Sequence, residues 1–196
     1  MSTAFVLGNG VSRRGIDPAI LRNYGPVYGC NALYREFAPD VLVATDTPIS
    51  TVIQESGYAR DHVFYTRRPM AGSGARALTR DYSGHSSGPN AAALAALHGH
   101  TLIYLLGFDM GPNTNSLFNN MYADTEFYKT SQHPPTFSGN WVKQITQIAR
   151  DFPAVNFVRL CGKTTARIAE LESVKNLVHL DLAGWLDRIN NAEDPR

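Results

Sequence analysis

The sequence contains only two cysteines among its 196 residues, Cys30 and Cys161. Two cysteines are too few for the disulfide framework of a small secreted domain, and both fall in or beside apolar runs, where a reduced thiol serves as a small apolar filler. The chain also lacks a run of about 18 apolar residues, and it lacks a basic leader with a cleavage site. These absences predict a cytoplasmic protein without a membrane span.

The chain has no excess of charge of one sign. It carries 18 Lys and Arg against 17 Asp and Glu, a formal net charge of +1 at pH 7, and its longest basic runs are pairs at 13–14 and 67–68. Without a basic field, binding to nucleic acid or to an anionic membrane is not expected. With 43% hydrophobic residues and no repeat or linker, the chain suffices for one ordinary core. We expect a single nucleotide-binding α/β domain over residues 1–196, with a homo-oligomer left open.

The first glycine-rich turn lacks the motifs of two common nucleotide-binding loops. Gly8 and Gly10 follow the apolar run 4–7, but Arg13 stands where a dinucleotide fingerprint has its third glycine, and no acidic residue ends the second predicted strand. No Gly-Lys-Ser/Thr follows the glycines, which argues against a P-loop. An Asp-x-Asp pair is absent and the histidines lack ligand spacing, so we predict neither a metal nor another cofactor.

Apolar runs alternate with helical patterns along the chain. Strands are predicted at 4–7, 26–30, 40–45, 62–65, 101–106 and 156–161, and helices at 16–23, 32–37, 48–57, 90–98, 141–150 and 164–174, with a short strand or helical tail at 177–190. Strands that are apolar throughout are typical of parallel strands covered on both faces. The pattern predicts a Rossmann-like three-layer α/β domain with a mainly parallel sheet. Its expected sheet core comprises Phe5, Val6, Val41, Val43, Leu102, Ile103, Leu105, Val158 and Leu160.

Polar residues follow the first three predicted strands. If these strands are neighbours, their carboxyl ends meet at one edge of the sheet, where open α/β folds bind ligands. Glycines there let the backbone approach a ligand closely, although a plain tight turn is the alternative explanation. The expected nucleotide-binding residues in this part of the chain are Gly8, Asn9, Gly10, Ser12, Asn31, Asp46 and Thr47.

A second candidate group, Ser86, Ser87 and Gly88, precedes the alanine-rich helix predicted at 90–98. Backbone N–H groups and the positive end of the helix dipole would suit a phosphate at this position. Serines before a helix also act simply as caps, and the sequence does not separate the two roles.

The stretch 111–139 is rich in Asn, Pro, Thr and aromatic residues and has no long apolar period. Such a segment is typical of a lid or insertion. We expect it to be poorly ordered without ligand and to close over the nucleotide phosphate, bringing Tyr122 and His133 toward the crevice.

The order of these motifs resembles the CMP-sialic-acid-dependent bacterial sialyltransferases that build lipooligosaccharide. The resemblance covers most of the chain and lies in 8–10 with 12, 16–17, 30–31, 86–88, 103–109 and 160–161. The related 6-hydroxymethylpterin pyrophosphokinase-like family has a similar pattern. The motifs therefore specify the fold and the nucleotide pocket better than the reaction.

The resemblance implies roles for individual residues. Positions matching Asn9, Asn31 and 86–88 would hold a cytidine nucleotide, with a polar residue near Thr47 contacting the donor. Of the two lid tyrosines that bind the donor phosphate, Tyr122 matches the second, and the first falls on Gly111. The histidine that removes the acceptor proton falls near Phe137, four residues after His133. If His133 is not the base, Asp109 and His85 are the next candidates.

Three functions remain open from the sequence. The first is a metal-independent, inverting glycosyltransferase that takes a sugar from a nucleotide donor, in particular a CMP-sugar, and passes it to a glycan or another hydroxyl acceptor. The second is a metal-dependent nucleotide pyrophosphokinase or phosphotransferase using acidic residues such as Asp46 and Asp109. The third is a non-catalytic nucleotide-binding module.

Overall fold

The computed structural model describes residues 2–191 and contains one sheet of eight strands, all parallel. The strand order is β5-β4-β3-β2-β1-β6-β7-β8, so the first three strands are neighbours, which meets the condition for their carboxyl ends to lie together. The strands are β1 (Thr3–Leu7), β2 (Val27–Cys30), β3 (Val41–Ala44), β4 (Phe64–Thr66), β5 (Arg76–Ala77), β6 (Leu102–Leu106), β7 (Asn156–Cys161) and β8 (Leu177–Asp181).

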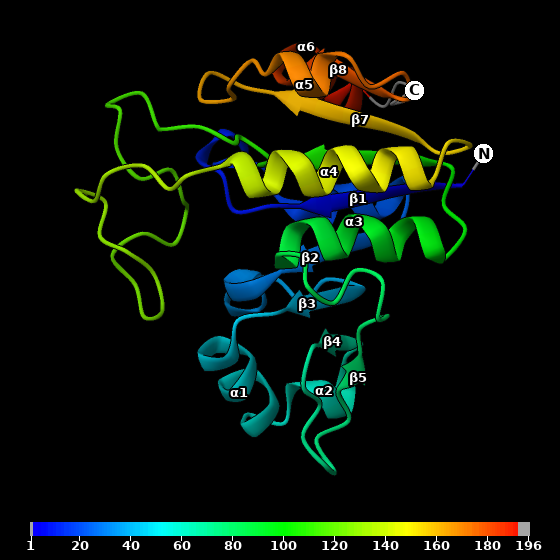
Figure 1. Cartoon of the computed structure of the whole chain (residues 1–196), viewed down its shortest axis with the longest axis vertical. Coiled ribbons are helices and arrows are strands. Elements are labelled where there is room, and N and C mark those ends of the chain that lie inside the picture. Colours follow the sequence, from blue (N-terminus) through cyan, green and yellow to red (C-terminus); the bar gives the residue numbers. More distant parts are fainter. Residues whose placement is uncertain (1, 192–196) are drawn as a thin grey trace.

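Helices cover both faces of this sheet, which confirms the predicted three-layer architecture. The α-helices are α1 (Thr47–Glu55), α2 (Tyr58–Asp61), α3 (Ser87–Leu97), α4 (Gly139–Asp151), α5 (Ala169–Glu172) and α6 (Leu182–Asn190), and three 3-10 helices are η1 (Val11–Arg13), η2 (Pro18–Asn23) and η3 (Asn31–Arg35). Helices α3 and α4 lie side by side across one face (Figure 1). On the other face, η2, η3 and α6 contribute Leu21, Leu33 and Trp185 to a second core.

Each apolar strand supplies both cores because successive side chains point to opposite faces. Val6 and Ile103 pack under α3, whereas Phe5 and Tyr104 stack on the other side with ring centroids 5.4 Å apart. All nine residues predicted for the sheet core are buried. Small alanines line α3 on all sides, and this allows the helix to lie close to both the sheet and α4.

The topology reverses beside β1, which pairs with β2 on one side and with β6 on the other. In open α/β sheets a crevice forms at such a switch point, outside the carboxyl ends of the strands. Residues 107–138 connect β6 to α4 without helix or strand and lie beside this edge of the sheet (Figure 1).

Several predicted elements differ in detail. The segments 16–23 and 32–37 form the short 3-10 helices η2 and η3, and 177–190 divides into β8 and α6. The helix predicted at 164–174 was wrong over most of its length, since only Ala169–Glu172 is helical. Thr164 and Thr165 bind the Asp109 carboxylate and the Ala166 N–H binds the Asp109 carbonyl, which holds this stretch in a loop. The two-residue strand β5 and the single-turn α2 were not predicted.

None of the helices within residues 2–191 has the length and the apolar composition that a membrane span requires.

Two histidines meet one buried tyrosine at the other end of the sheet. The Tyr28 hydroxyl lies 2.8 Å from His98 Nδ1 and 3.2 Å from His100 Nε2. Burial lowers the pKa of both imidazoles; Arg76 lowers that of His98 further, and His98 lowers that of His100 further.

This cluster predicts acid sensitivity. At a pH between the lowered pKa values of the folded state and the ordinary value of about 6.5, the two histidines bind protons in the unfolded chain but not in the folded chain. Their contribution to the free energy of unfolding is therefore complete above about pH 6.5 and is lost as the pH falls. Urea denaturation should give a smaller free energy of unfolding at about pH 5 than at about pH 7.5. The double variant His98→Gln/His100→Gln should have a shallower pH dependence, and an unchanged slope would contradict this assignment.

Candidate functional site

A cavity of about 310 Å³ lies at the switch point, at the carboxyl ends of β1, β2 and β6 and against the first turn of α3. The loops after β1, β2 and β3 enclose it, together with the segment 107–138 that follows β6. Its lining comprises Gly8, Asn9, Gly10, Cys30, Asn31, Asp46, Ser86, Ser87, Gly88, Pro89, Gly107, Phe108, Asp109, Met110, Gly111, Asn119, Asn120 and Trp141.

Most of the residues expected to bind nucleotide line this one cavity, although they come from four separate parts of the chain. Two of the expected residues, Ser12 and Thr47, lie outside it. Ser12 lines a larger, second cavity over β7 and β8, and Thr47 lines a small polar cleft with Thr51 and Arg68.

The loops after β1 and β6 approach each other so closely that only glycine fits at positions 8 and 10. A Cβ on Gly8 would lie 2.6 Å from the Gly107 carbonyl oxygen, and one on Gly10 would lie 2.5 Å from the Asp109 carboxyl carbon. Gly107 itself has φ +70°, which favours glycine. These glycines therefore let the loops after β1 and β6 pack directly on each other and form one wall of the cavity.

Asn31 turns the chain sharply at the end of β2, with φ 52°. Asparagine tolerates this left-handed conformation better than most residues. The Ser87 hydroxyl lies 2.8 Å from Asn31 Oδ1 and accepts a hydrogen bond of 2.9 Å from the Thr45 N–H. The start of α3 is thus joined to the ends of β2 and β3, and the Asn31 amide group is held at the cavity.

Asn9 is held by the segment that the sequence predicts as a lid. Its carbonyl oxygen accepts a hydrogen bond of 2.8 Å from the Met121 N–H, and its Nδ2 donates to the Tyr128 hydroxyl at 3.3 Å. The Ala32 N–H donates to the same hydroxyl, also at 3.3 Å. Burial raises the pKa of Tyr128, so the phenol is neutral and keeps a proton to donate. No role for Tyr128 was predicted from the sequence, because its contacts join segments about a hundred residues apart.

The first turn of α3 faces the cavity, and the side chain of its N-cap residue, Ser86, makes no capping hydrogen bond. Ser86 is occupied by α4: its N–H donates to Gln144 Oε1 and its hydroxyl accepts from Trp141 Nε1, both at 3.0 Å. The turn therefore presents backbone N–H groups and the positive end of the helix dipole, an arrangement that suits an anion.

Asp109 is only 3% exposed, and its carboxylate accepts four hydrogen bonds from three loops. The donors are the Ser12 N–H at 3.0 Å, Asn119 Nδ2 at 3.1 Å, Thr164 Oγ1 at 2.6 Å and Thr165 Oγ1 at 3.2 Å. With both oxygens engaged, this side chain joins the loops around the cavity and is poorly placed to exchange a proton with a ligand.

Tyr122 and His133 do not line the cavity. The Tyr122 hydroxyl accepts a 3.0 Å hydrogen bond from buried Arg13 and donates to Glu36, behind the loop after β1. His133 packs near Phe118, and its Nδ1 lies 2.7 Å from the Pro134 carbonyl oxygen. The segment itself packs on the cavity rim through Met121 and Asn119, whose Oδ1 accepts from the Val11 N–H at 2.8 Å.

Three titratable side chains line the cavity. Asp109 is engaged, and burial raises the pKa of the Cys30 thiol to about 12, so this group stays neutral. Asp46, directly after β3, is exposed, and its side chain makes no capping hydrogen bond to α1. Among residues 2–191, no group of three or more His, Cys, Asp or Glu side chains is arranged to hold a metal ion.

A parallel sheet with a polar, ligand-sized cavity at its switch point defines a Rossmann-like α/β protein with a candidate nucleotide site. Neither a family model nor a curated protein matches the sequence. The fold is similar to that of the sialyltransferase CstII from Campylobacter jejuni, solved in complex with the substrate analogue cytidine-5'-monophosphate. The TM-score is 0.50 at 14% sequence identity, over 93% of this chain and 87% of CstII, a likeness of fold.

Proposed function

We propose that this protein is a metal-independent, inverting glycosyltransferase that takes its sugar from a CMP-linked donor. The observation that carries the proposal is the cavity itself, where Asn9, Asn31 and the uncapped start of α3 converge at the switch point. Its position in a fold shared with a CMP-binding sialyltransferase supports cytidine as the base.

The proposed reaction forms a bond between an acceptor oxygen and the anomeric carbon while the bond from that carbon to the phosphate oxygen breaks. CMP leaves with the electron pair. The N–H groups at the start of α3 are the groups available to stabilise the departing phosphate, and Tyr128 positions Asn9 beside them. Asp46 is the lining carboxylate left to take the proton of the acceptor hydroxyl.

The test is turnover with a panel of nucleotide sugars, following released CMP, UMP and UDP. We expect CMP release from a CMP-sugar without added metal. Tight CMP binding with no turnover of any donor would instead support the non-catalytic binding module, which the engaged states of Tyr122 and Asp109 favour as the second candidate. Magnesium-dependent consumption of ATP would support a pyrophosphokinase.

The two asparagines at the strand ends give a direct binding test. Asn9→Ala and Asn31→Ala should each weaken CMP binding by about 1 to 3 kcal/mol, because a polar group of the nucleotide loses its partner. Asn31→Gly separates this loss from backbone strain, since glycine keeps the left-handed turn. Calorimetry should find Asn31→Gly as weak as Asn31→Ala, and unchanged affinity in all three variants would place the nucleotide elsewhere.

A further inference from the structure

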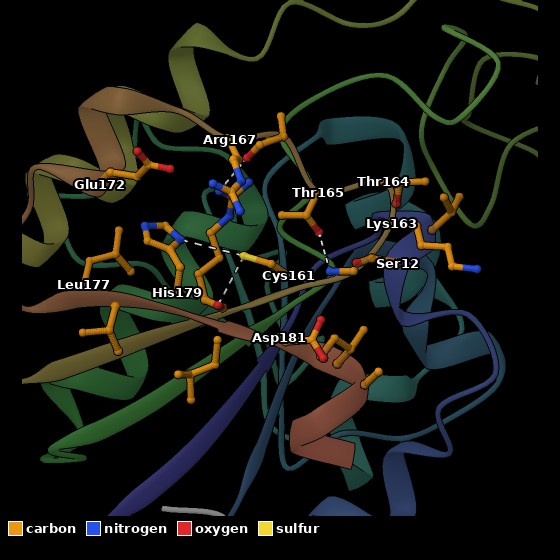
Figure 2. A pocket seen from close by; sticks show the side chains of 18 of the residues that line it. Ser12, Cys161, Lys163, Thr164, Thr165, Arg167, Glu172, Leu177, His179 and Asp181 are labelled. Carbon is orange, nitrogen blue, oxygen red and sulfur yellow. Dashed lines mark hydrogen bonds between the residues drawn. The ribbon is translucent and has the colours of Figure 1, made fainter. Parts of the chain in front are cut away.

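A second, larger cavity of about 1320 Å³ lies along β8 and over the loops that follow β7 and β8 (Figure 2). Its volume exceeds what one monosaccharide fills. Leu177, Leu180 and Leu186 give it an apolar floor, and 161–167 form its polar side.

The charges around this cavity favour an anion. Lys163, Arg167 and Lys175 line it, against Glu172 and Asp181. The Asp181 carboxylate caps α6, accepting from the Gly184 N–H at 2.8 Å, and the positive end of the helix dipole partly offsets its charge. Within residues 2–191, neither Lys163 nor Arg167 forms an ion pair.

A buried cation adds to this field. Arg159 is 1% exposed and donates to three backbone carbonyl oxygens, those of Phe108 at 2.9 Å, Ala166 at 2.9 Å and Asp109 at 3.0 Å. No carboxylate among the described residues pairs with it within 4.0 Å. The carbonyl dipoles balance this buried charge, and the Asp109 and Glu172 carboxylates favour it from farther away. Burying a cation is still costly, and a nearby anion would offset part of that cost.

The wall between the two cavities is thin and polar. Ser12 faces the second cavity, two residues after Gly10 in the first, and its buried hydroxyl has no hydrogen-bond partner within residues 2–191. Asp109 lines the first cavity and binds Thr164, which lines the second. The two cavities meet at this wall, at the carboxyl edge of the sheet, and an acceptor bound in the second cavity extends into the first to reach Asp46.

We propose that the second cavity binds the acceptor, and that the acceptor is a carbohydrate carrying an acidic group, a carboxylate or a phosphate, attracted by the basic side chains of the lining, Lys163, Arg167 and Lys175. The role as acceptor rests on the proposed function, whereas binding of an acidic carbohydrate does not.

Calorimetry with the CMP-saturated protein tests this, using galactose 6-phosphate, galacturonate and neutral galactose as probes. The acidic sugars should bind about tenfold or more tightly than galactose, and the advantage should shrink between about 50 and 500 mM salt. The two acidic probes distinguish a phosphate from a carboxylate. Equal affinities for all three sugars, or CMP binding with no sugar binding, would overturn the proposal.

Two variants with the same charge change locate the binding. Lys163→Gln/Arg167→Gln should lower the affinity for the acidic sugar about tenfold and leave CMP affinity unchanged. Lys143→Gln/Arg150→Gln removes the same charges from the exposed side of α4 and should lower neither. An equal loss in both variants would indicate a general charge effect and contradict the site.

Cys161 provides a readout at the cavity that is independent of activity. Its thiol lines the cavity, lies 3.9 Å from His179 Nδ1 and is partly exposed, while Cys30 is buried and serves as an internal reference (Figure 2). Galactose 6-phosphate should slow alkylation of Cys161 relative to the free protein, and alkylation at an undiminished rate despite calorimetric binding would place the sugar elsewhere. Binding of the acidic sugar without transfer to it from any donor would refute the proposed reaction and retain the site.

Discussion

Asp109→Ala should lower the free energy of unfolding by about 3 to 5 kcal/mol, because it removes a buried charge that satisfies four donors at once. The Ser12 N–H, the Asn119 amide and two threonine hydroxyls would lose their acceptor together. Urea denaturation with linear extrapolation measures the change.

The exposed Asp187 on α6 provides the control. Asp187→Ala removes the same group from a surface position and should change the free energy of unfolding by no more than about 0.5 kcal/mol. If Asp109→Ala were as stable as Asp187→Ala, the carboxylate would not join the loops as the structure indicates. Asp109→Ala protein that remains folded should also bind CMP weakly, since the loops it joins form the cavity walls.

Asp46→Asn should lower kcat about 100-fold, equivalent to about 2.7 kcal/mol of transition-state stabilisation, while CMP affinity changes little. The carboxylate lines the cavity, carries no capping bond and would act only when the acceptor hydroxyl loses its proton. The asparagine side chain keeps the shape of the aspartate but cannot take the proton of the acceptor hydroxyl. Steady-state CMP release gives kcat, and calorimetry gives the affinity.

His133→Gln is the informative comparison for Asp46→Asn. His133 lies outside the cavity lining, with its Nδ1 beside the Pro134 carbonyl, so its replacement should leave kcat within about threefold. The reverse pattern, a large loss for His133→Gln and none for Asp46→Asn, would require the segment 111–138 to rearrange during turnover. The histidine expected from the family resemblance would then be the base.

The fold followed from the sequence because its strands are short, apolar and buried on both faces. A run such as 102–106, which is apolar at every position, is typical of a strand in the middle of a parallel sheet. The grouping of Asn9, Asn31 and Ser87 at one cavity was likewise predictable, because carboxyl ends of neighbouring parallel strands meet at one edge.

What could not be read from the sequence depends on contacts between distant loops. Asp109 has the spacing of a strand-end carboxylate, but its burial under Thr164 and Asn119 comes only from the folded chain. The same contacts hold 164–166 as a loop where local periodicity predicts a helix. Tyr128 becomes a cavity neighbour only because residues 107–138 return across β1 and β2.

The pairing of β1 with β6 also affects how the chain can be made. Thr3 pairs with Leu102, so the central ladder of the sheet joins segments separated by most of the first half of the chain. During synthesis β1, β2 and β3 leave the ribosome long before β6, and one side of β1 has no strand to pair with until then. Sheets built from such distant pairs fold slowly and expose apolar edges meanwhile. The first cavity, which needs β6 and the start of α3 together, can form only after that ladder closes.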